Sequence, residues 1–237
     1  MEFSMKKVNA LFIKETKDLK KNANILLMSA LPIIFSLIYS RLFKSSEGVS
    51  MILATCTNMN FCMVASFVIA MLIAEEKEKN TLKTLMLSGV SPMEFLLGKA
   101  LVTILIANFS NIFIFIIFGL DFQYFVQFFI VGLILSISMV IIGAVIGLLS
   151  KNQMASGTVG MPITMGFLII PTLASLNKTF EIIANFIPTY HANKLMENLI
   201  NGESLLSGKV SILVLLVWIV IASLAFAYVY KIKKLDE

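Results

Sequence analysis

Charged side chains are scarce in this sequence, and long stretches lack them altogether. Asp, Glu, Lys and Arg make up 14% of the 237 residues, about half of the usual share, whereas hydrophobic residues make up 58%. A water-soluble fold of this length has too little interior to cover so much apolar surface. The composition therefore excludes an ordinary soluble domain and favours a protein that a lipid bilayer surrounds.

Histidine and cysteine are also rare, which limits the chemistry that the chain can perform. His191 is the single histidine, and a lone histidine does not make a metal site. Cys56 and Cys62 fall in one apolar segment, about 240° apart around a helix, so a disulfide between them is implausible. With no catalytic triad in the sequence, we predict neither a catalytic residue nor a metal site, and no cofactor bound by this chain.

Six uncharged apolar segments of 18 to 25 residues run along the chain. Each is long enough to cross a hydrocarbon core, which takes roughly 17–25 residues. All the formal charges lie in the connections, as expected if a charge at the bilayer centre costs at least about 2.5–3.5 kcal/mol. We predict an all-α integral membrane protein, a single domain over residues 1–237, with six spans at residues 23–40, 51–74, 100–120, 125–149, 158–176 and 210–230.

The basic residues are distributed unevenly between the two sides of the predicted membrane. Fourteen of the 19 Lys and Arg residues fall in the N-terminal segment, the second and fourth connections and the tail, and five fall on the other side. The positive-inside rule then places both termini in the cytoplasm. Eighteen of the 19 basic residues are lysine, which suggests an AT-rich bacterial genome, so we expect the chain in a bacterial cell membrane. The net charge of +5 follows from this asymmetry, so we expect the bilayer and no nucleic acid as a partner. No cleavable signal peptide is expected.

Two stretches outside the spans have amphipathic helical patterns. Residues 5–21 carry apolar residues at helical spacing between lysines, although Glu15 falls on the same face. We interpret them as a helix lying on the inner surface, or simply as a basic anchor. Pro188 divides residues 177–209, which we predict to be a re-entrant or interfacial pair of helices on the outer side of the membrane.

Residues 75–99 form the most informative connection. Its first half has helical spacing, and Gly89 suits the left-handed residue that ends a helix. Ser91 is then a helix N-cap, Pro92 stands at the first helical position, and Glu94 completes a capping box. The second helix should therefore begin at Pro92 and continue into span three. Such a helix-break-helix elbow is either a stiff turn or a docking site for a cytoplasmic partner.

Polar residues within the spans are a second candidate site. Those on span two that share one α-helical face, within about 80°, are Thr55, Asn58, Cys62 and Ser66. Span three adds Asn108 and Asn111, three residues apart. Such groups need partners in lipid, so they either hydrogen-bond between helices or line a substrate path. In span four, Gly143 and Gly147 predict a close helix contact.

The elbow also carries a resemblance to a family. An acidic cluster ends span two, and the matching residues after it are Thr81, Leu85, Ser88-Gly89-Val90-Ser91-Pro92, Glu94 and Gly98-Lys99. This pattern resembles the ABC-2 type permeases, the membrane subunits of type-V-fold ABC exporters. The whole layout of inner helix, six spans and outer helical pair is similar too. The size is similar to that of short permeases of bacterial drug, bacteriocin-immunity and amphipathic-peptide exporters.

The resemblance implies a partner and a site. A separate ATPase, holding ATP and Mg, would supply the energy, because Gly98-Lys99 is followed by Ala100 and no phosphate-binding loop is present in the sequence. Two permeases, identical or paralogous, would form a dimer that exports a hydrophobic or amphipathic peptide or drug. The residues implied as the ATPase-coupling surface are Glu75, Glu76, Glu78, Thr81, Leu82, Leu85, Ser91, Pro92 and Glu94.

Two other functions remain open at this point. One is a membrane immunity or sensor subunit that does not transport but binds a peptide or a partner protein. The other is a secondary transporter, which usually needs an ionisable group inside the membrane for coupling. The predicted spans contain no such group, so the secondary transporter ranks third.

Overall fold

The computed structural model describes residues 3–43 and 46–233, and in these residues every regular element is a helix. The elements in chain order are α1 (Met5–Leu19), α2 (Ala23–Leu42), α3 (Ser46–Asn60), η1 (Phe61–Val68), α4 (Ile69–Glu78), α5 (Thr81–Leu87), α6 (Pro92–Ile117), η2 (Phe122–Tyr124), α7 (Phe125–Leu149), α8 (Gln153–Leu173), α9 (Lys178–Ala184), α10 (Pro188–Ile200), η3 (Leu205–Gly208) and α11 (Lys209–Lys233).

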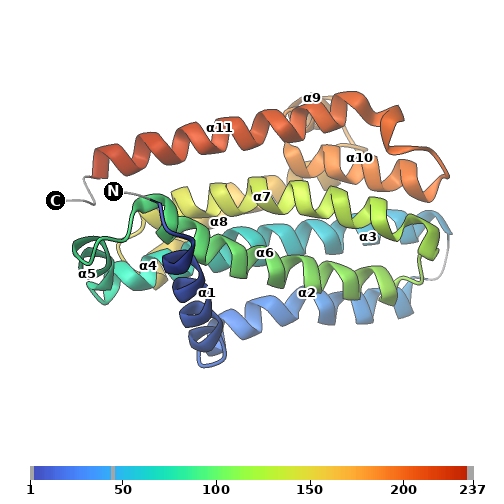
Figure 1. Cartoon of the computed structure of the whole chain (residues 1–237). Helices are drawn as coiled ribbons and strands as arrows, with labels where there is room; N and C mark the ends of the chain where they lie inside the picture. Colours follow the sequence, from blue (N-terminus) through green and yellow to red (C-terminus); the bar gives the residue numbers. More distant parts are fainter. Residues whose placement is uncertain (1–2, 44–45, 234–237) are drawn as a thin grey trace.

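Six helices among the described residues are long and apolar enough to cross a membrane, which confirms the six-span prediction. Their ranges are Ala23–Leu42, Val49–Glu78, Pro92–Ile117, Phe122–Leu149, Gln153–Leu173 and Lys209–Lys233. The spans run roughly side by side, with α1 and α5 at one end and α9 and α10 toward the other (Figure 1). We call the first the elbow end. Helix α1 crosses the bundle rather than running along it.

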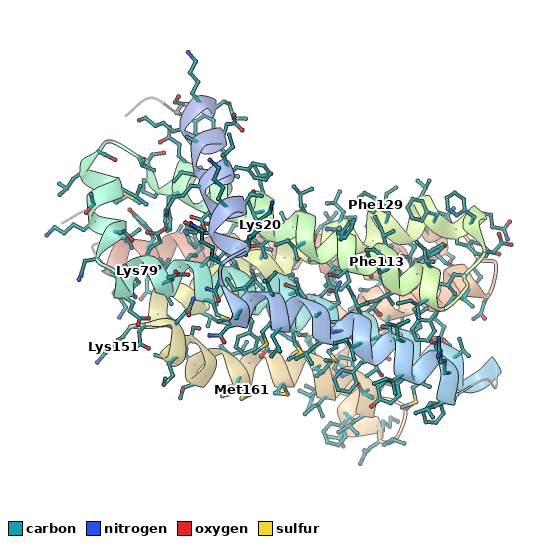
Figure 2. All side chains as sticks on the ribbon, turned by 90° about the horizontal axis from the view of Figure 1, so that it is seen from below. Lys20, Lys79, Phe113, Phe129, Lys151 and Met161 are labelled. Atoms are coloured by element: carbon teal, nitrogen blue, oxygen red, sulfur yellow. The ribbon has the colours of Figure 1, made fainter. Side chains whose placement is uncertain are left out.

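Three lysines at the elbow end lie apart from two phenylalanines within the spans. Lys20, Lys79 and Lys151 lie toward the elbow end, whereas Phe113 and Phe129 lie further along the spans (Figure 2). This is the arrangement that a bilayer favours, because charges cost free energy in its hydrocarbon core.

Span two forms the centre of the bundle. Of its most apolar window 89% is buried, against 17–22% for α2, α8 and α11. Helices α6 and α7 both pack against it. The outer faces of α2, α8 and α11 are left for lipid or for another protein chain.

The glycines of span four confirm the predicted close contact. A Cβ atom on Gly143 would lie 2.1 Å from the Ser66 carbonyl oxygen, and one on Gly147 would lie 2.8 Å from the Ala70 carbonyl oxygen. Ser66 belongs to η1, a π-helix in the middle of span two. The backbones of α7 and span two therefore approach as closely as they do because no side chain stands between them.

Helix ends differ from the predicted spans where capping decides them. Span five was expected at residues 158–176, but α8 begins at Gln153 because the Asn152 side chain accepts a hydrogen bond from the Ala155 amide. Span three was expected at residues 100–120 within a helix that starts at Pro92; the start at Pro92 is confirmed, but the helix ends at Ile117, before Gly119 at φ +63°. Hydropathy locates the apolar middle of a span, whereas caps set its ends.

The outer pair consists of α9 and α10, and the break falls at Pro188 as predicted. Polar contacts fix it to the spans: Thr189 donates to the Phe167 carbonyl at 2.6 Å, and Trp218 donates to the Phe186 carbonyl at 2.7 Å. His191 lies between the Asn185 carbonyl and the Ser211 hydroxyl at 2.8 and 3.0 Å. Burial lowers the pKa of His191, so this ring is a neutral joint between helices at neutral pH. Whether the pair lies in the membrane interface stays a prediction.

Candidate functional site

The elbow is built as its sequence predicts, with one additional break. Helix α4 continues span two to Glu78, and Asn80 then adopts a left-handed conformation with φ 56°. Helix α5 follows and ends before Gly89, at φ +84°, whose amide donates to the Met86 carbonyl at 3.0 Å. A side chain at such a φ is strained, which explains glycine at this turn.

The predicted capping box at the start of α6 is present. The Ser91 hydroxyl accepts from the Glu94 amide at 3.2 Å, and the Glu94 carboxylate accepts from the Ser91 amide at 2.7 Å. Glu94 is fully buried and also accepts from the Ser4 amide at 2.6 Å. The Lys7 ammonium donates to the Gly89 carbonyl at 2.5 Å. The capping box therefore holds the start of α1 as well as the start of α6.

A buried group of charges lies at the meeting point of α1, α4 and α6. The Lys99 ammonium is 2.7 Å from a Glu15 carboxylate oxygen and 3.1 Å from a Glu76 carboxylate oxygen. All three residues are at most 5% exposed. Lys14 bonds to Glu76 and lies 3.5 Å from Glu15, and the Thr81 hydroxyl donates to Glu76. We call Lys14, Glu15, Glu76 and Lys99 the ion network.

The ion network explains why Glu15 stands on the apolar face of α1. Val8, Leu11 and Leu19 on that face are buried, and Glu15 points inward with them because Lys99 of α6 meets it. Burial alone would lower the pKa of Lys14, but its hydrogen bond to Glu76 and the negative charge of Glu15 outweigh burial and raise it. Lys14 is thus a charged partner of Glu76.

The remaining acidic residues of the elbow also bind helices of this chain. Glu75 accepts from the Asn22 side chain at 3.3 Å, from the Gln153 side chain at 3.0 Å and from Lys79. Glu78 accepts from the Gln153 amide at 3.0 Å, at the start of α8, where an anion is favourable. The resemblance assigns the acidic cluster to a partner surface, but its side chains form hydrogen bonds to other parts of this chain.

The predicted coupling surface included Leu82 and Leu85, and the neighbouring Met86 packs with them. Leu82 and Met86 are 4% and 8% exposed and belong to the apolar core, and Leu85 is half-buried. The outward face of the elbow carries Lys83 and Thr84, together with Leu87, 77% exposed, and Met93, 57% exposed. Sequence reasoning missed Leu87 and Met93. The signal was that Leu87 stands apart from the inward pair Leu82 and Met86, which are four residues apart.

The structure brings together some of the polar span residues but not all. The Asn60 amide group donates to the Ala107 carbonyl at 2.8 Å, and that of Asn108 donates to the Ile104 carbonyl at 2.9 Å and to Ser136 at 3.0 Å. Both Asn108 and Asn111 lie against Gly132 of α7. Asn60 and Ser136 thus join the predicted pair Asn108 and Asn111 in one buried cluster between spans two, three and four.

The predicted polar face of span two assumed an α-helix throughout, and that assumption is wrong. Cys62 and Ser66 lie in η1, where hydrogen bonds join residues five apart and turns are wider, so their angles to Asn58 differ from those of an α-helix. Asn58 is 1% exposed, and its side-chain atoms have no hydrogen-bond partner among the described residues. Thr55 lies elsewhere, in a pocket of about 530 Å³ that Tyr190 also lines.

Asn58 and Asn60 should respond differently to replacement by leucine. Asn60→Leu removes a buried hydrogen bond between span two and span three, whereas Asn58→Leu replaces a buried amide that makes none. We expect Asn60→Leu to cost about 1–3 kcal/mol and Asn58→Leu to be neutral or stabilising. Thermal unfolding of the purified variants measures the difference, and equal destabilisation by the two would contradict it.

No cluster of three or more His, Cys, Asp or Glu that could hold a metal occurs among the described residues. Both cysteines are buried and free.

Comparison with protein families gives a match that spans nearly the whole chain. The family model described as ABC-2 family transporter protein matches residues 5–228. No curated protein matches the chain.

Proposed function

The chain belongs to the ABC-2 transporter family, and on that premise we propose that it is the transmembrane permease subunit of an ATP-binding cassette exporter. A separate ATPase subunit that holds ATP and Mg drives it from the cytoplasm, where both termini lie. Two permeases, two copies of this chain or one copy and a paralogue, form the pathway in the cell membrane. The cargo is a hydrophobic or amphipathic peptide or drug.

The observation that carries the proposal is the continuity of the elbow with the central spans. Helix α4 is the last part of span two, and α6 forms span three. The short helix α5 between them projects at the elbow end (Figure 1). A partner that displaces α5 therefore acts on the most buried helix of the bundle.

The outward face of the elbow fits a protein partner in its chemistry. Leu87 lies one helical turn from the exposed Lys83 and Thr84 on α5, and a second large apolar side chain, Met93, is exposed at the start of α6. Exposed apolar anchors within a polar rim are typical of docking surfaces. The polar residues Asn60, Asn108, Asn111 and Ser136 are buried between three spans and open to a substrate only if those spans separate.

Truncating the two exposed anchors should release the ATPase. We expect Leu87→Ala with Met93→Ala to weaken the ATPase–permease complex by about 30-fold, the equivalent of about 2 kcal/mol for a small anchor cluster. The variant should insert and unfold like wild type, because neither side chain is buried. The measurement is the ratio of ATPase to permease that co-purify in detergent.

The matched control is Leu213→Ala with Leu224→Ala on α11, where both side chains are more than 60% exposed and lie outside the elbow. An unchanged ratio in the elbow variant would place the contact elsewhere. If wild type recovers no ATPase under any condition, the alternative of a non-transporting immunity or sensor subunit takes precedence.

A further inference from the structure

Within the ion network, Lys99 is the one side chain that lies on neither α1 nor α4 and contacts both. It lies on α6, 1% exposed, with Glu15 of α1 at 2.7 Å and Glu76 of α4 at 3.1 Å. Glu76 in turn accepts from Thr81, the first residue of α5. Lys99 thus stands at the junction of four helices: α1, α4, α5 and α6.

Apolar packing alone does not fix how α1 lies on α6. Leu11 rests on Gly98, where a Cβ atom would come within 2.6 Å of the Leu11 Cβ. Such a contact is non-directional, so a helix that rests on it can slide or turn at little cost. Ser4 and Lys7 bond to Glu94 and Gly89 and hold the first turn of α1. The ion network has fixed partners at short distances further along the helix, so it fixes where the second half of α1 lies.

The chemistry of the ion network favours a role in positioning over one in stability. Removing charges from water costs about as much free energy as their attraction returns, and apolar residues of the same size often stabilise a fold as well or better. A buried lysine between two carboxylates therefore adds little net stability. What it adds is geometric specificity, because its ammonium must reach two oxygens on two different helices.

We propose that Lys99 is a positioning residue that fastens α1 to the elbow, so that both move as one body when the elbow is displaced. The source of that displacement rests on the proposed function, whereas the fastening itself does not. Neither the family match nor the elbow motif assigns a role to Glu15. The proposal makes α1 a working part of the coupling unit rather than a passive anchor.

The test uses a variant in which the three buried side chains are uncharged, so that a change in the position of α1 can be told apart from a loss of stability. Glu15→Gln, Glu76→Gln and Lys99→Met together remove the three buried charges. Lys14 loses its two carboxylates but is partly exposed to solvent, so no buried charge is left without a partner and the bundle should fold as wild type does. Glu15→Gln alone is a second variant, which removes the charge that α1 presents to Lys99 and leaves both Lys99 and Lys14 paired with Glu76. Lys99→Arg keeps the charge, and Lys6→Met on the exposed face of α1 is the matched control.

The readout is a distance between α1 and the elbow in the full chain. Spin labels at Thr16→Cys and Thr84→Cys, both exposed positions, report it in a background with Cys56→Ala and Cys62→Ala. We expect one narrow distance peak in wild type, Lys99→Arg and Lys6→Met. The triple variant and Glu15→Gln should lose that single peak and show a broad or split distribution at an unchanged unfolding temperature.

Two results would overturn the proposal: a single narrow peak in both the triple variant and Glu15→Gln, or a broad distribution in wild type. The measurement on the permease alone needs no ATPase, so it stands even if the proposed function fails. In the complex with a co-purified ATPase, adding ATP and Mg should leave the wild-type peak single. A peak that splits there would refute motion as one body without affecting the assignment as a permease.

Discussion

Replacing Lys99 alone with methionine should destabilise the protein strongly. The change leaves Glu15 and Glu76 buried with only the partly exposed Lys14 as a cation. Removing one partner of a buried ion pair costs about 3–5 kcal/mol, and we expect the lower end because Lys14 still reaches both carboxylates. For a chain of this length the unfolding temperature should fall by roughly 6–12 °C. Thermal unfolding in detergent measures the shift.

The control for this prediction is Lys83→Met, an exposed lysine of the elbow. It removes the same charge without leaving a buried carboxylate, and its effect should stay within about 0.5 kcal/mol of wild type. If Lys99→Met proves as stable as Lys83→Met, water must reach the two carboxylates. The ion network would then not be buried in the membrane-embedded protein.

Replacing Gly143 with valine should separate span four from span two. The Cβ of any residue there would lie 2.1 Å from the Ser66 carbonyl oxygen and 2.6 Å from the Ile69 side chain, so the facing backbone must move. Overpacking of this kind costs about 1–3 kcal/mol, and we expect the upper end because a backbone atom cannot turn aside. The yield of folded protein and its unfolding temperature should both fall.

Gly166→Val is the matched control, because Gly166 is also within a membrane helix but a Cβ there would meet no atom closer than 3.9 Å. The two substitutions share their effect on helix propensity, so their difference isolates the contact. Equal stability of the two variants would show that α7 and span two do not pack as closely as the structure has them.

Features that depend on neighbouring residues were predictable from the sequence. The six spans follow from the lengths of uncharged segments, and the start of α6 follows from Ser91, Pro92 and Glu94 at adjacent positions. The contact at Gly143 could be expected from a small-residue spacing known to bring helices together. The physical cause lies within a few residues in each case.

Features that depend on residues far away in the sequence could not be predicted. Glu15 and Lys99 are 84 positions apart, so on its own Glu15 argued against an amphipathic α1. The π-helix η1 has no local signature in Phe61–Val68, and it altered the face on which Cys62 and Ser66 were expected. The resemblance assigned the acidic cluster to a partner surface, and nothing near it in the sequence indicated that Asn22 and Gln153, at the starts of α2 and α8, would bind it.

The π-helix also affects how this chain should be aligned with other sequences. Its hydrogen bonds span one residue more than those of an α-helix, so η1 accommodates extra chain between fixed ends at Asn60 and Ile69. A relative with one residue fewer in this interval would have an ordinary α-helix there, with Gly143 facing a different neighbour. A single-residue gap in an alignment belongs between positions 61 and 68 rather than in a loop, even though it falls in the middle of a membrane span.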